Sequence, residues 1–121
     1  MKVNPDNKIC NVAQQSRDDK SVLAFWKSVI KLRKEHPELV YGSLERLEFK
    51  GCEDKVFTYK RSLDGKTAFV VISFSTEPVE FDIDFRVGPA LIESTNNSTG
   101  IITGNKVKLG GFEGGIYVVS E

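Results

Sequence analysis

The sequence is poor in the residues that most often build metal sites. It holds one histidine, His36, and two cysteines, Cys10 and Cys52, in 121 residues. Neither cysteine has a second cysteine or a histidine at ligand spacing, so we expect no metal site. Two cysteines are also too few for a disulfide scaffold. We favour two free thiols, with a Cys10–Cys52 bridge as the alternative.

An excess of charge of either sign is also missing. Lysine plus arginine and aspartate plus glutamate each number 17. A balanced chain has no general attraction for nucleic acid or for an anionic membrane surface, so we expect neither as a partner. No stretch approaches the roughly 20 apolar residues of a membrane-spanning helix, and the polar first residues do not form a secretory signal. We therefore expect a soluble, cytoplasmic protein.

Motifs for cofactors and catalysis are absent as well. The chain has neither a Gly-x-Gly-x-x-Gly fingerprint after a strand nor a phosphate-binding loop, so we expect no cofactor. His36 precedes Pro37 at a helix end, where we interpret it as a solvated residue. The acids at positions 80, 82 and 84 are about 7 Å apart along a strand, a spacing that also marks an ordinary solvent-facing surface. We predict no catalytic residue.

One amphipathic helix is predicted over residues 18–36. Asp18 is a suitable N-cap, and Pro37 disfavours helical geometry in the residue before it. We interpret the lysines of the opposite face as solvated, and Phe25 and Trp26 as core residues rather than a sugar-stacking pair. The apolar residues at helical spacing are Val22, Phe25, Trp26, Val29, Ile30 and Leu32. Residues 1–15 are predicted to be irregular.

After Gly42 the apolar pattern changes to a period of two, which predicts strands. The segment 67–73 is apolar without alternation, so both of its faces should be covered. An Asp-Gly pair at 64–65 indicates a hairpin, and the glycine pairs at 110–111 and 114–115 indicate a tight turn or bulge. The predicted strands are 44–49, 56–61, 67–73, 79–85, 90–93, 106–109 and 116–120. The residues expected in the core include Phe69, Val71, Phe81, Ile83 and Phe85.

These elements predict a mainly β fold with one N-terminal helix. Strands joined by short polar turns favour an antiparallel β-sandwich or barrel-like domain. The expected organisation is an irregular segment plus helix over residues 1–42, followed by an all-β domain over residues 43–121.

Several segments also resemble a known family. They are Val3–Gln15, Ser21–Lys27, Ile30–His36 and Val40–Gly42, with looser likeness at Phe69–Ser75 and Leu109–Tyr117. Together they resemble the late part of α-glucosidases of the α-amylase superfamily, in the maltase and isomaltase branch. The resemblance implies an irregular stretch, the last helix of a catalytic (β/α)8 barrel, and then an all-β C-terminal domain.

The resemblance also implies what this chain does not carry. The catalytic carboxylates of the family lie on upstream barrel strands, and no position here matches their motifs. The chain would then be the noncatalytic C-terminal portion of an enzyme that hydrolyses terminal α-glucosidic bonds of oligosaccharides. Its partner would be the catalytic barrel, or another copy through weak self-association of the helix. The alternative is a stand-alone carbohydrate-binding or interaction module, for which Tyr59, Phe112 and Tyr117 are candidate contact residues.

Overall fold

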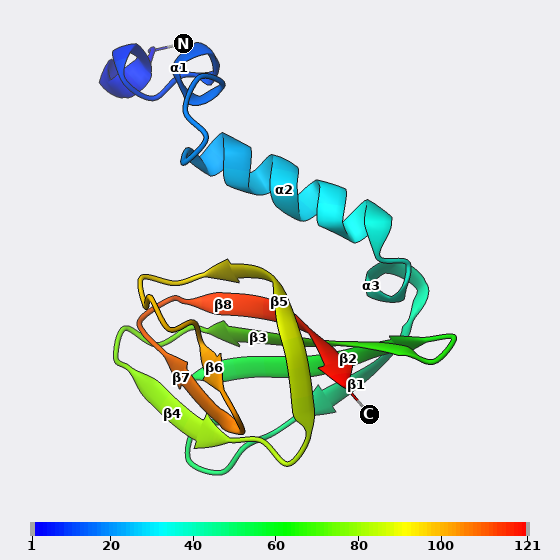
Figure 1. Ribbon diagram of the computed structural model, residues 1–121. Helices are drawn as coiled ribbons and strands as arrows, with labels where there is room; N and C mark the ends of the chain where they lie inside the picture. Colours follow the sequence, from blue (N-terminus) through cyan, green and yellow to red (C-terminus); the bar gives the residue numbers. More distant parts are fainter. Residues whose placement is uncertain (1, 121) are drawn as a thin grey trace. The chain divides into compact units, whose positions relative to one another are not determined.

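The computed structural model describes residues 2–120, which divide into two compact units after Glu35 (Figure 1). Each unit is described by itself. We placed the domain boundary after residue 42, and that boundary stays a prediction. The contacts assign α3 (Glu38–Tyr41) to the strand unit, because it packs on two strands of that unit.

The first unit contains three helical segments where we expected one. They are η1 (Pro5–Lys8), α1 (Val12–Gln15) and α2 (Val22–Glu35). Asparagine side chains cap the two short helices. The side-chain oxygen of Asn4 accepts from the amide of Asp6 at 3.0 Å, and that of Asn11 accepts from the amide of Gln14 at 2.9 Å. The prediction of an irregular segment was therefore too coarse.

Helix α2 begins four residues later than predicted. Ser21 Oγ accepts from the amide of Ala24 at 3.1 Å, so Ser21 and not Asp18 provides the cap. Asp18 instead accepts from the amide of Lys20 in the preceding turn. The helix ends at Glu35, before Pro37, as predicted. None of its residues is buried.

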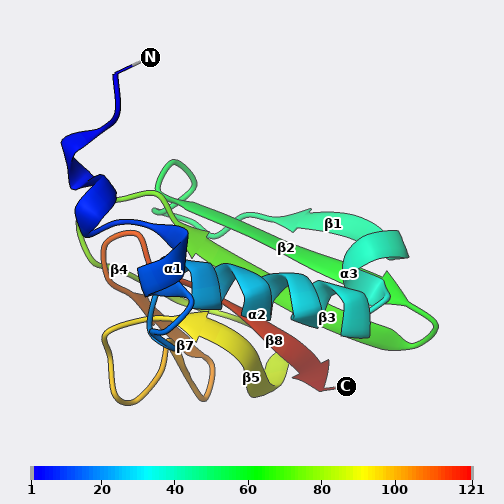
Figure 2. The same ribbon diagram turned by 90° about the horizontal axis from the view of Figure 1, so that it is seen from above.

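The second unit is a two-layer antiparallel β-sandwich, which confirms the predicted fold class. A five-stranded sheet has the order β1-β2-β3-β8-β5, and a three-stranded sheet has the order β4-β7-β6 (Figures 1 and 2). The strands are β1 (Ser43–Leu47), β2 (Val56–Leu63), β3 (Lys66–Ser73), β4 (Val79–Asp82), β5 (Arg86–Ser94), β6 (Ile102–Thr103), β7 (Lys106–Leu109) and β8 (Gly114–Ser120).

The main core lies where the two sheets face each other. Phe69 and Val71 of β3 are fully buried, as predicted, and Phe81 and Ile83 are buried with them. Phe85, which we expected in the core, is only half-buried, and Lys60 Nζ lies 3.5 Å from its ring centroid. The buried core cluster consists of Cys52, Phe69, Val71, Val79, Phe81, Ile83, Ile101, Val107, Leu109 and Tyr117.

Strand β5 differs most from its prediction. It covers nine residues, whereas we expected only positions 90–93. Its pairing with β8 shifts register between Val87 and Ala90 and again between Ala90 and Ile92. Gly88 and Pro89 lie in the first irregularity and interrupt the alternation that marks a strand in sequence. The two-residue strand β6 was not predicted at all.

Candidate functional site

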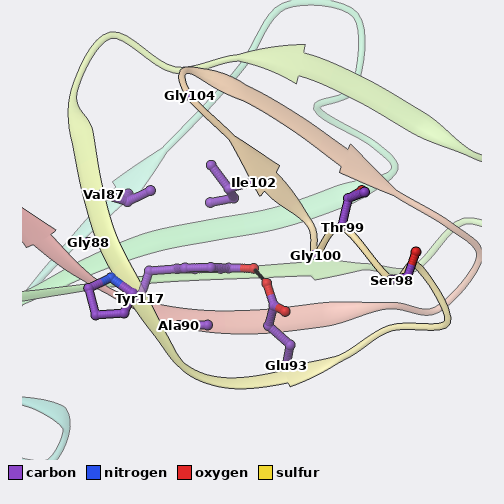
Figure 3. Close-up of a pocket in the computed structure, with 11 residues that line it drawn as sticks. Val87, Gly88, Ala90, Glu93, Ser98, Thr99, Gly100, Ile102, Gly104 and Tyr117 are labelled. Atoms are coloured by element: carbon purple, nitrogen blue, oxygen red, sulfur yellow. Dashed lines mark hydrogen bonds between the residues drawn. The ribbon is translucent and has the colours of Figure 1, made fainter.

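An open hollow lies at the β5 edge of the five-stranded sheet. Its volume is about 440 Å³. Strands β5 and β8 contribute Glu93 and Tyr117, and the loop between β5 and β6 contributes Ser98, Thr99 and Gly100 (Figure 3). The hollow therefore combines one carboxylate, one phenol and two hydroxyl side chains.

Register places the two main side chains together. Glu93 lies opposite Gly115, and a Cβ built at Gly115 would lie 2.9 Å from the Tyr117 ring. The missing side chain at position 115 leaves the space that the ring occupies. The Tyr117 hydroxyl then reaches the neighbouring strand and donates to Glu93 Oε1 (Figure 3).

Glu93 also holds the loop that closes the hollow. Its Oε1 accepts a second hydrogen bond from the backbone amide of Ile101 at 3.2 Å. Gly100, at φ +80°, lies directly beside the carboxylate, where an added Cβ would be 3.3 Å from both of its oxygens. Among residues 2–120, no hydrogen-bond donor reaches Glu93 Oε2. One oxygen is thus structural, and the other is open.

The phenol at this site is held in its neutral form. Burial, followed by the hydrogen bond to Glu93, raises the pKa of the Tyr117 hydroxyl far above its usual range. The side chain is 3% exposed. Tyr117 is therefore a hydrogen-bond donor and not a general base at neutral pH.

A second hollow, of about 480 Å³, is built around Glu113 in the turn between β7 and β8. Both carboxylate oxygens are occupied, because the amides of Asn96 and Gly110 donate to them at 3.0 and 2.7 Å. The hydrogen bond from Asn96 lowers the pKa of Glu113 most, against an opposing effect of burial, and the amide of Gly110 lowers it further. Glu113 ties the turn to the β5–β6 loop. The expected tight turn is present, with Phe112 at φ +56°.

The acids of the 79–85 segment take part in surface ion pairs. Glu80 on β4 faces the neighbouring strand β7, where Lys106 Nζ lies 2.7 Å and Lys108 Nζ 3.6 Å from its carboxylate oxygens. The hydrogen bond to Lys106 lowers the pKa of Glu80. Asp82 and Asp84 are exposed. This is the solvent-facing surface that we predicted, with a cross-strand ion pair added.

His36 is less solvated than we predicted. Its Nδ1 lies 2.7 Å from Glu38 Oε1, and Glu38 is only 5% exposed. Burial raises the pKa of Glu38, but the hydrogen bond and charge of His36 outweigh it and leave the pKa below its usual value. The pair joins the turn before α3, so its evident role is structural. Our interpretation missed it because Glu38 is two residues away across Pro37.

The aromatic candidates for sugar contact do not form a common platform. Tyr59 pairs with Val70 across β2 and β3, whereas Tyr117 pairs with Phe69, so the two tyrosines project from opposite faces of the five-stranded sheet. Phe112 is 66% exposed in the turn before β8. Tyr117 lines the hollow at the β5 edge.

Phe25 and Trp26 do not lie in a core. They are 42% and 59% exposed, and Val22 and Ile30 on the same helix are exposed too. The expectation of core packing is therefore wrong for α2 as described by the structure. Lys27, Lys31 and Lys34 are exposed, as predicted.

Metal ligands and thiols add no further site. Within residues 2–120, no group of three or more histidine, cysteine, aspartate or glutamate side chains could hold an ion. Cys10 is exposed and Cys52 is buried, both as free thiols. The Cys52 thiol donates to the carbonyl of Phe49 at 3.2 Å, and burial raises its pKa. In the same range, no helix is both long and apolar enough to cross a membrane.

Sequence reasoning missed Glu93 as a site residue. It is one acid in a short predicted strand, and nothing in its neighbourhood sets it apart. The usable signals were Gly88-Pro89, which favours a bulge, and Gly115, which leaves space beside the next strand. Together they indicate an irregular sheet edge, where hollows form.

The chain is similar in sequence to yeast enzymes that act on glucosides. No protein-family model matches the chain. It is 35% identical over 109 residues to alpha-glucosidase MAL32 of Saccharomyces cerevisiae, covering 90% of this chain and 18% of that protein. It is 31% identical over 110 residues to oligo-1,6-glucosidase IMA3 of the same yeast, covering 89% of this chain and 18% of that protein.

The fold has relatives among solved structures. The crystal structure of trehalulose synthase MutB from Pseudomonas mesoacidophila MX-45 matches with a TM-score of 0.88 and 33% sequence identity. The match covers 99% of this chain and 22% of MutB. The chain thus spans about a fifth of the length of the proteins it matches.

Proposed function

From the correspondence of this chain to the C-terminal region of α-glucosidases and related enzymes of the α-amylase family, we propose that it is the noncatalytic C-terminal portion of such an enzyme. The parent enzyme hydrolyses terminal α-glucosidic bonds of oligosaccharides. The observation that carries the proposal is the match of 90% of this chain to 18% of an alpha-glucosidase. The chemistry of that enzyme then resides in the other four-fifths.

The state of the acidic side chains supports a noncatalytic role. A retaining glycosidase needs one carboxyl group as nucleophile and a second as acid and base, roughly 5–5.5 Å apart. Glu80 is paired with lysines, and both oxygens of Glu113 accept backbone amides. Glu93 is bound to Tyr117. Each of these three carboxylates therefore has a structural partner within the fold.

The apolar face of α2 supports a partner. Val22, Phe25, Trp26 and Ile30 are all exposed, and each large side chain left in water forgoes roughly 1.5–3 kcal/mol of burial. An isolated helix of 14 residues is marginal in water. We propose that this face packs against the catalytic barrel of the parent enzyme. Weak self-association of the chain is the competing outcome.

The catalytic part of the proposal is tested with the chain alone. Incubation at high concentration with maltose, isomaltose and an aryl α-glucoside should give no turnover. Activity that survives repurification, and that disappears in one of the variants Glu80→Gln, Glu93→Gln or Glu113→Gln, contradicts the proposal. Activity unchanged in all three variants identifies a contaminant.

The partner is tested by complementation. An alpha-glucosidase relative that lacks its corresponding last fifth should regain solubility and activity when this chain is co-expressed with it. The variant Trp26→Asp places a charge on the exposed apolar face of α2 and should abolish the rescue. Lys27→Asp changes the adjacent, solvated position and serves as the matched control. Equally strong rescue with both variants would show that the apolar face of α2 is not needed for the association.

A further inference from the structure

The carboxylate of Glu93 is hydrogen-bonded to residues 2–120 through only one of its two oxygens. Oε1 is occupied by the Tyr117 hydroxyl and the Ile101 amide, which fix the carboxylate in one orientation. Oε2 receives no hydrogen bond from residues 2–120 and belongs to a side chain that lines the hollow. An ionised carboxylate oxygen only accepts hydrogen bonds, and bonds to a charged acceptor are stronger than neutral ones. A ligand for this oxygen must therefore bring a donor.

The other lining residues narrow the class of ligand. No lysine, arginine or histidine lines the hollow, so an anion has no counter-charge there. A purely apolar ligand would bury Oε2 without a partner, at a free-energy cost. Ser98 and Thr99, which carry hydroxyl groups, also line the hollow. Thr99 Oγ1 donates to Asn97 Oδ1 at 2.9 Å, and its lone pairs can still accept from a ligand.

Apolar surface completes the hollow. Val87 and Ile102 line it together with the Tyr117 ring, and these three present carbon atoms to the interior (Figure 3). The volume, about 440 Å³, lies at the small end of the range for ligand sites, roughly 300–1,000 Å³. The chemistry that fits is a small molecule with several hydroxyl donors on one edge and C–H groups on its faces.

We propose that this hollow is a noncatalytic binding site for a small polyhydroxylated ligand, about one sugar ring in size, whose hydroxyl groups donate to Glu93 Oε2. The site uses only residues 87–117 of the strand unit. It therefore stands independently of the proposed function, which concerns a catalytic part that this chain does not contain.

The test is a titration of the full 121-residue chain, labelled with ¹⁵N, with methyl α-glucoside, glycerol and methylamine as separate probes. Saturable shifts are expected at the backbone amides of Thr99, Gly100 and Ile101 with methyl α-glucoside. Glycerol, which lacks the ring, should bind more weakly. Saturation with methylamine alone would identify a site for organic cations and overturn the proposal.

Three variants locate the binding. Glu93→Gln keeps an acceptor for Tyr117 and loses the charge at Oε2, so affinity should fall by about tenfold. Ala90→Trp adds a large side chain to the lining of the hollow, leaves the charge of Glu93 in place and should abolish the shifts. Glu80→Gln removes an exposed carboxylate on another sheet and should leave affinity unchanged.

The titration can fail or succeed whatever the activity and complementation experiments show, so the two proposals are tested separately. If Glu93→Gln does not give a dispersed, folded spectrum, Ala90→Trp alone decides. Equal affinity in the original chain and Ala90→Trp, or shifts centred on Phe112, would show that the hollow is not the binding site. Absence of any saturable shift also overturns the proposal, whether or not the chain complements a catalytic barrel.

Discussion

Truncation of Phe69 provides the most direct test of the fold. Its side chain is fully buried at the centre of β3, and its ring meets that of Phe85 edge to face at 5.1 Å between centroids. Moving one such side chain from water to a core contributes roughly 1.5–3 kcal/mol. The aromatic pair adds about 0.5–1.5 kcal/mol, and an unfilled cavity adds a further penalty. Phe69→Ala should therefore lower the free energy of unfolding by about 3–5 kcal/mol.

The measurement is urea unfolding followed by far-ultraviolet circular dichroism. A shifted midpoint with an unchanged m-value would report a change in stability and not in the unfolded state. Phe112→Ala is the matched control, because Phe112 is 66% exposed, and it should cost less than about 0.5 kcal/mol. Since the expected loss is large compared with the stability of a small domain, Phe69→Leu provides a milder variant with a smaller loss.

A second core position, Phe81, tests whether the effect of Phe69→Ala is general to the core. Phe81 is 7% exposed and stacks on Phe49 with ring centroids 4.6 Å apart, so it reports the opposite sheet. Phe81→Ala should fall in the same range as Phe69→Ala. A loss below about 1 kcal/mol at both positions would place them on a surface and refute the reasoning.

The remaining predictions concern the groups around the two hollows. Because the folded-state pKa of Tyr117 is raised above its ordinary value of 10.0, the stability it provides is full below that pH and is lost at higher pH. Tyr117→Phe should remove this alkaline loss, measured by thermal unfolding between about pH 9 and 11. The pKa of Glu113 is lowered from 4.5, so its contribution is present above that pH and is lost as pH falls through the folded-state value. Glu113→Gln should flatten the acid side of the stability profile; an unchanged profile would contradict the assignment. Gly115→Ala crowds the Tyr117 ring, and amide exchange at Ile101 should accelerate because Glu93 loses its fixed orientation.

The elements with a clean period were predictable from sequence in kind, although β4 ends at Asp82 and not at residue 85 as we predicted. The alternation at Val79, Phe81 and Ile83 assigns inward positions without any knowledge of partners, and all three are buried. The unbroken run at Ala68–Val71 is buried throughout, as expected of a central strand. In both cases the local pattern and the tertiary environment agree, so a single sequence is enough.

Prediction failed where a contact distant in sequence decides the structure. Strand β5 has two register shifts, and its length follows from pairing with β8. Ser21 and Asp18 are both suitable N-cap residues for α2. Ser21 provides the cap, because the side chain of Asp18 accepts from the amide of Lys20 in the preceding turn. The Glu93–Tyr117 contact joins positions 24 residues apart. No local pattern encodes such a pair, so the candidate site could not be predicted.

The two units differ in what holds them together. The strand unit buries its own core, with Phe69, Val71 and Val107 fully enclosed. Helix α2 also has an apolar face, but none of its residues is fully buried. Amphipathic periodicity indicates that one face of a helix packs against another element, but it does not identify that element. This is why we wrongly assigned Trp26 to a core. The pattern indicates an apolar face that needs a packing partner, but it does not show where that partner comes from. The exposed face of α2 is therefore the part of this chain on which the proposed association with a catalytic barrel depends.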